Sequence, residues 1–357
     1  MINQITKQFI EYWSMERSIG HLMEVAKSCY FISIGIDEIN DGIKNPKRMR
    51  ITILQLIYFA ICTFIVNLFS TTNYFYSFIK LDILPSHFQL IMFGVFGFAS
   101  IWCFAFKIDI LISEIKSNLS PFRIFYFLIN NIKSKHRLTD FNYNRLAIWS
   151  RIVIIVNLDY GLPLFEVIAM GLAILIAILS QKSIWILITI FFISHLFIGI
   201  IAFSFVLCFD LILFSYYKIR FDQIHSSIKS ISNSKLMINK KKENQCIDLI
   251  VEHNTVSIEI HKLNLVLRRS QGVMSMVLST VRIIILHLLI RFNNNIFLNM
   301  MLSIAFCILV VFGFALSYLL TLQIKSAHQS DKLINSILIK SKMRFKLKLK
   351  VIYNFVK

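Results

Sequence analysis

The stretch from residue 296 to residue 324 reads IFLNMMLSIAFCILVVFGFALSYLLTLQI and holds no charged residue in 29 positions. A bilayer core about 30 Å thick is crossed by a helix of about 20 apolar residues, so this stretch is long enough. A helix of a soluble core would show one polar face, and none is visible here. Lys325 follows at once, and the 33 residues from Lys325 to Lys357 carry nine Lys and Arg. A span followed by dense positive charge is typical of a helix end that faces the cytosol.

Composition extends this interpretation to the whole chain. The 357 residues are 57% hydrophobic and only 16% charged, whereas soluble domains are about a quarter charged. The sequence therefore predicts an all-α, polytopic membrane helix bundle with six transmembrane helices. Residues 1–50 form a cytosolic N-terminal segment, 51–324 the transmembrane bundle, and 325–357 a basic cytosolic tail. The expected spans are about 51–70, 88–106, 152–179, 184–209, 273–290 and 296–324.

The basic residues lie on one side of these spans. Of the 38 Lys and Arg, 34 fall in the N-terminal segment, the loops after the second and fourth spans, and the C-terminal tail. The three alternate loops hold one each: Lys80, Lys182 and Arg291. This asymmetry predicts a multi-pass protein of the plasma membrane with both termini in the cytosol. The expected partner of the net charge of +19 is the anionic inner leaflet of the bilayer rather than nucleic acid.

Motifs of enzymes and metal sites are missing from the sequence. It has no HExxH, no GxSxG and no phosphate-binding glycine loop, and these are the patterns that place catalytic groups together. The six cysteines are single, and no Cys/His cluster has the spacing of a zinc site. We expect neither an enzyme nor a cofactor or metal.

Polar side chains inside the predicted spans are candidates for a ligand pocket, because buried charge in a membrane is costly. Glu166 and Arg282 each lie near the middle of a span and can form a pair at a cavity; the alternative is that they satisfy each other, or backbone groups, between packed helices. Histidine, aromatic and asparagine side chains of the outer halves can complete a pocket for a small amphipathic ligand; the alternative is ordinary interface packing. These candidates are Trp185, Phe192, His195, His287 and Asn299.

The cytosolic side is expected to hold long helical extensions. Helix is predicted to begin after the turn at Gln181-Lys182 and to run from Ile184 to Tyr217. At about 1.5 Å per residue that length projects well beyond a bilayer. The run Lys240-Lys241-Lys242 is predicted to be a loop, with helical spacing returning from Ile247 to Leu267.

The C-terminal third resembles the arthropod gustatory receptor family. The segment EHNTVSIEIHKLNLVLRR carries His253, Leu263 and Asn264, similar to a histidine, leucine and asparagine pattern before that family's fifth span. SAHQSDKLINSILIK, residues 326–340, resembles the segment after its sixth span. The resemblance implies a chemosensory receptor, a subunit of a ligand-gated cation channel that detects a small molecule and assembles as a homo- or hetero-oligomer, a tetramer in the family.

One departure bears on conduction. The family ends in a seventh span with a tyrosine and glutamine pattern, and in that family this helix lines the pore. The nearest match here, SYLLTLQI at residues 317–324, lies in the sixth span and is one residue short. The seventh helix is therefore expected to be missing, and ligand recognition is implied more strongly than conduction. The alternative function is a multi-pass small-solute transporter with Glu166 and Arg282 as its coupling pair.

Overall fold

The structure is a computed structural model in which all secondary structure of the described residues is helical, so the all-α class is confirmed for this part of the chain. The described residues are 14–29, 32–33, 46–71, 101, 104–112, 114–115, 120–133, 137–161, 163, 183–233, 240–291, 303, 307, 310, 325, 328, 329 and 332.

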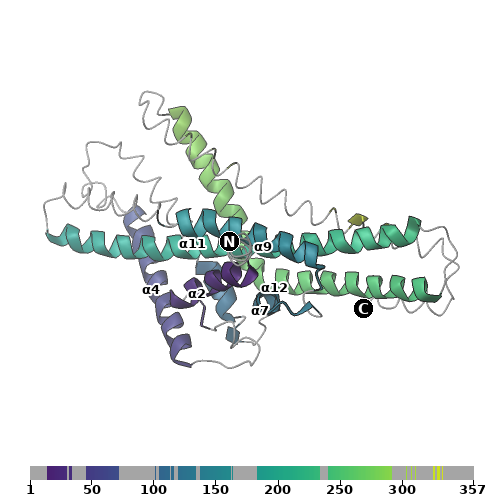
Figure 1. The fold of residues 1–357 in the computed structure, drawn as a ribbon. Helices are drawn as coiled ribbons and strands as arrows, with labels where there is room; N and C mark the ends of the chain where they lie inside the picture. Colours follow the sequence, from purple (N-terminus) through teal and green to yellow (C-terminus); the bar gives the residue numbers. More distant parts are fainter. Residues whose placement is uncertain are drawn as a thin grey trace, which may run out of the picture.

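Two very long helices organise the molecule (Figure 1). Helix α11 runs from Ser183 to Asn233, and α12 runs from Lys240 to Arg291. The first half of α12 lies alongside the C-terminal half of α11, whereas its later part diverges from α11 (Figure 1). The pair is therefore an antiparallel helical hairpin over the C-terminal half of α11.

The bounds of this hairpin confirm one prediction and correct another. Helix α11 begins directly after Gln181-Lys182, as predicted, and extends 16 residues past Tyr217 to Asn233. The predicted loop at Lys240-Lys241-Lys242 is wrong, because these residues form the first turn of α12. Lysine is a good helix former, so a run of three does not by itself interrupt a helix. The predicted cytosolic helix and the predicted fifth span are parts of this one helix.

Shorter elements pack around α11. Helices α4, α9 and α2 and the π-helix η2 all contact it. The bounds are Glu16–Gly20 for the π-helix η1, His21–Ser28 for α2, Pro46–Thr71 for α4, Ser120–Ile129 for α7, Asp140–Ile154 for α9 and Ile155–Gly161 for η2.

Local sequence signals explain where α4 and α9 begin. Pro46 is the first residue of α4, where its missing N–H costs no helical hydrogen bond. The Thr139 side chain caps α9 by accepting a hydrogen bond of 3.4 Å from the backbone N–H of Asn142. Asp140 in the first turn and Arg151 in the last complement the helix dipole.

The described core is centred on aromatic side chains of α11. The Phe209 ring lies 5.8 Å from Phe106, 5.4 Å from Phe122, 5.2 Å from Phe125 and 5.8 Å from Phe205, measured between centroids. Two of these contacts are edge-to-face and two are tilted, geometries that suit the ring quadrupoles. Phe209 therefore joins α11 to α7 and to the helical residues around Phe106.

The membrane spans are only partly within the described residues. Most of the predicted spans 88–106, 152–179 and 296–324 lies outside them. Where the structure describes side chains as well as backbone, which leaves out residues 183–200 of α11 among others, no helix combines the length and the apolar character of a membrane crossing.

Candidate functional site

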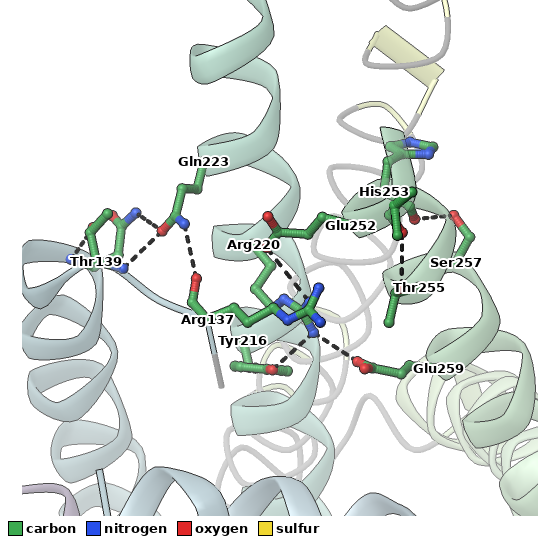
Figure 2. Close-up of polar contacts among 12 residues, drawn as sticks. Arg137, Thr139, Tyr216, Arg220, Gln223, Glu252, His253, Thr255, Ser257 and Glu259 are labelled. Carbon is green, nitrogen blue, oxygen red and sulfur yellow. Dashed lines mark hydrogen bonds and ion pairs between the residues drawn. The ribbon is translucent and has the colours of Figure 1, made fainter. Parts of the chain in front are cut away.

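A buried arginine joins α11 to α12 (Figure 2). Arg220 is 1% exposed, and its Nη1 donates hydrogen bonds to Glu259 Oε2 at 2.7 Å and to the Tyr216 hydroxyl at 3.1 Å. Its Nη2 lies 3.7 Å from Glu252 Oε1. Glu252 and Glu259 are two turns apart on α12, so their carboxylates flank the guanidinium. One cation of α11 is thus bracketed by two anions of α12.

The electrostatics of this group keep the arginine charged. Burial by itself lowers the pKa of Arg220, but Tyr216, Glu259 and Glu252 outweigh it and raise that pKa above its ordinary value. Burial raises the pKa of Tyr216 to about 12, with Arg220 opposing the shift. The phenol therefore stays neutral at physiological pH. Arg220 thus stays charged beside Glu252 and Glu259, and the neutral Tyr216 hydroxyl accepts one further hydrogen bond from it inside the helical pair.

The residues that carry the family resemblance divide between the two faces of α12. His253 is 3% exposed with its ring centroid 5.4 Å from that of Phe221, and Leu263 is also buried. With Val256, these positions follow the alternating three- and four-residue spacing of a helix–helix seam. Asn264 is exposed. Packing against Phe221 of α11 accounts for His253, and burial in the core accounts for Leu263.

A second polar contact fixes α9 against α11 (Figure 2). Gln223 Nε2 donates to the Arg137 carbonyl at 2.9 Å. Its Oε1 accepts hydrogen bonds from the Thr139 backbone N–H at 3.0 Å and from Asn142 Nδ2 at 2.9 Å. One glutamine of α11 thereby holds the N-terminus of α9, three residues after Arg220 on the same helix.

A buried polar cluster joins α4 to residues 104–115. Lys107 Nζ donates a hydrogen bond to Gln55 Oε1, and Gln55 Nε2 donates to the Cys29 carbonyl at 2.8 Å. Glu114 accepts hydrogen bonds from the backbone N–H of Ser33 at 3.0 Å and from its hydroxyl at 2.6 Å. Burial lowers the pKa of Lys107 to about 7, with Glu114 partly opposing the shift. The ammonium therefore titrates near neutral pH.

A cavity of about 680 Å³ opens between the N-terminal helices and the end of α9. At its wall, Asp159 of η2 lies 3.4 Å from Arg151 Nη2 and 3.4 Å from His21 Nε2. The Asp159 side chain is 29% exposed and paired with both groups. The cavity has the size of a small-molecule site.

The residues proposed from sequence for a ligand pocket are only partly placed. Arg282 is half-buried and His287 is exposed, both on α12. Glu166 and Asn299 lie outside the described residues. The remaining three candidates are Trp185, Phe192 and His195. They belong to α11, and the structure describes their backbone but not their side chains. The pairing of Glu166 with Arg282 stays a prediction.

Sequence reasoning missed Arg220 and the charged cavity. The sequence signal for the ionic contact was the seven-residue spacing of Glu252 and Glu259, which places both carboxylates on one face of a helix. In the N-terminal segment, Glu16, Gly20, Glu24 and Lys27 recur every three or four residues, which marks one face. No local pattern indicates that Arg151 lies opposite that face.

Comparison with known proteins adds no relative. No protein-family model, no curated protein and no solved structure matches this chain.

Proposed function

We propose that this chain is a multi-pass plasma-membrane protein of the chemosensory type, a subunit of a ligand-gated cation channel that detects a small molecule. The proposal rests on the resemblance to gustatory receptors, on the one-sided distribution of Lys and Arg, and on the α11–α12 hairpin. Its fold is the six-span bundle with cytosolic termini. Its expected neighbours are the anionic inner leaflet and other subunits, in a tetramer by resemblance.

The single observation that carries the proposal is the continuity of α11. Residues 184–209 contain no Asp, Glu, Lys or Arg, and the same helix continues without a break to Asn233. A helix of 51 residues is about 76 Å long, more than twice the thickness of a bilayer core. An apolar half followed by a polar half suits a helix that leaves the membrane and extends into the cytosol.

The polar half of α11 is the part that Arg220 attaches to α12. In the proposed topology this contact lies in the cytosol, because the loop after the fourth span holds ten Lys and Arg. The hairpin then forms an inner anchor layer below the bundle. A ligand in the outer half of the bundle can act on this layer only by binding one arrangement of the helices more tightly than another.

The orientation is tested with single cysteines placed in the tail and in the predicted outer loop. Reagents that cannot cross membranes are expected to label a cysteine at Ser77 in intact cells, and one at Ser341 only after permeabilisation. Both positions are serines, so the exchange is nearly isosteric. Labelling of Ser341→Cys in intact cells would overturn the topology and the receptor assignment with it.

Channel activity is tested in voltage-clamped cells that express the chain alone or together with a gustatory-type subunit. The expected result is a small-molecule-evoked cation current that requires this chain. Saturable uptake of the compound without any current would identify a transporter instead. A Lys218→Met variant serves as a control for loss of a positive charge on α11, because Lys218 pairs with Asp222 of the same helix.

A further inference from the structure

The cavity beside Asp159 is bordered by both π-helices of the described chain. Glu16, Arg17 and Gly20 belong to η1, and Asp159 belongs to η2. Fewer than about 1% of residues adopt π-helical geometry, and such segments occur frequently at functional sites. Two of them meeting at one cavity, from segments more than 130 positions apart in the sequence, indicate a site rather than a packing gap.

The charges of the wall have both signs in equal number. Leaving His21 aside, three lining side chains are acidic, Glu16, Glu24 and Asp159, and three are basic. The basic side chains are Arg17, Lys27 and Arg151. Asp159 is occupied by Arg151 and His21, each at 3.4 Å. The η1–α2 face therefore presents both carboxylates and cations to the cavity.

Apolar atoms occupy a smaller part of the same wall. Met23 of α2 and Ile129 at the end of α7 line the cavity alongside the charged groups. A ligand that complements the acidic, basic and apolar side chains of this wall carries a cationic group, an anionic group and a small apolar part. A simple polyanion would meet Glu16 and Glu24, and a simple cation would meet Arg17 and Lys27, with like-charge repulsion in both cases.

From this arrangement we propose that the cavity binds a small zwitterion of the amino-acid and short-peptide class. Its ammonium pairs with Glu16 or Glu24, its carboxylate pairs with Arg17 or Lys27, and its side chain packs on Met23. The binding site itself does not depend on the chemosensory function. Only its placement on the cytosolic side rests on the topology proposed above.

Gly20 provides a way to fill the cavity without straining the backbone. It lines the cavity with ordinary helical dihedrals, φ −57° and ψ −49°. A Cβ added there meets no atom within 4 Å. Gly272, on α12, has the same freedom and does not line the cavity. Gly20→Leu and Gly272→Leu are therefore a matched pair, one inside the site and one outside it.

The experiment measures binding of the dipeptide glycyl-leucine to the purified full chain in detergent micelles by isothermal titration calorimetry. Two end-blocked analogues, N-acetyl-glycyl-leucine and glycyl-leucinamide, carry only the negative or only the positive charge. The expected result is saturable binding of glycyl-leucine, retained in Gly272→Leu and lost in Gly20→Leu, with both analogues about tenfold weaker or more. Absence of saturable binding, or binding that Gly20→Leu leaves unchanged, would overturn the proposal.

Comparing the dipeptide with its N-acetyl analogue on two glutamate variants shows which carboxylate binds the ammonium of the dipeptide. If Glu24 holds it, Glu24→Gln weakens glycyl-leucine about tenfold and leaves the N-acetyl analogue unaffected, because that analogue has no ammonium to lose. If Glu16 holds it, Glu16→Gln produces this pattern instead. Equal binding of dipeptide and N-acetyl analogue in the unmodified chain would identify an anion site and refute the zwitterion. A circular dichroism melt of each variant reports folding separately, so a loss of binding is read only from folded protein.

Discussion

Replacing Arg220 with methionine tests whether the α11–α12 hairpin depends on its ionic contact. The variant removes the hydrogen bonds to Glu259 at 2.7 Å and to Tyr216 at 3.1 Å and leaves the two carboxylates without their cation. Breaking a buried ion pair from one side costs about 3–5 kcal/mol. Glu259 is 30% and Glu252 19% exposed, so water solvates part of the abandoned charge. We therefore expect a loss of about 3 kcal/mol, at the low end of that range.

Hydrogen exchange measured by mass spectrometry detects this loss locally. A loss of about 3 kcal/mol corresponds to exchange about 100-fold faster, and we expect it in peptides that cover residues 216–224 and 250–262. Lys218→Met is the matched control. Its pair with Asp222 is a half-buried i,i+4 contact within one helix at 2.6 Å, and contacts of this spacing are worth about 0.3–0.5 kcal/mol. The Lys218→Met variant should therefore change the hydrogen-exchange rate by only about twofold.

The two carboxylates can then be separated by double-mutant cycles. Glu259 accepts a hydrogen bond from Arg220, whereas Glu252 lies 3.7 Å away and makes only a Coulombic contact. The coupling free energy of Arg220→Met with Glu259→Gln should therefore exceed that with Glu252→Gln. Exchange in Arg220→Met that is no faster than in Lys218→Met, or a larger coupling to Glu252, would refute the reasoning.

Three further predictions concern the core, the pH dependence and a helix cap. Phe209→Ala removes four ring contacts and should cost about 3–5 kcal/mol in thermal unfolding; a loss below about 1 kcal/mol would show that the aromatic cluster is loosely packed. Burial raises the pKa of Asp210 to about 7 and lowers that of Lys107 to about 7. The folded chain thus holds a proton on Asp210 that the unfolded chain releases from about pH 4, so stability should fall from pH 4 to 7. It should rise again from pH 7 to about 10, where the unfolded chain binds a proton that Lys107 in the folded chain does not. Each limb amounts to at most about 5 kcal/mol. Asp210→Asn should flatten the acidic limb and Lys107→Met the basic limb in thermal melts recorded across pH, and an unchanged profile contradicts the assignment. Thr139→Ala should cost about 0.5–1 kcal/mol, because its capping hydrogen bond is long at 3.4 Å; Thr139→Ser, which keeps the hydroxyl, is the control, and equal melting temperatures of the two variants would exclude the cap.

The sequence alone determined the helical class and much of the helix pattern. The start of α11 follows from the turn at Gln181-Lys182 and the apolar run after it, because local hydrophobicity and turn residues act over a few positions. Helical spacing between Ile247 and Leu267 likewise predicted part of α12. The lysine run at 240–242 misled the same reasoning, because charge was read as a break although lysine favours helix.

Only the tertiary structure decided which charged residues meet. Arg220 contacts Glu259 because the hairpin sets the register of α12 against α11. Asp159 contacts His21 because two segments far apart in the chain pack at one end of α9. Local sequence patterns extend over one or two helical turns, whereas an ion pair or a cavity depends on helices brought together by the burial of the whole core. The hydrophobic periodicity of one segment predicts which of its faces is buried, but it does not predict which other segment packs against that face.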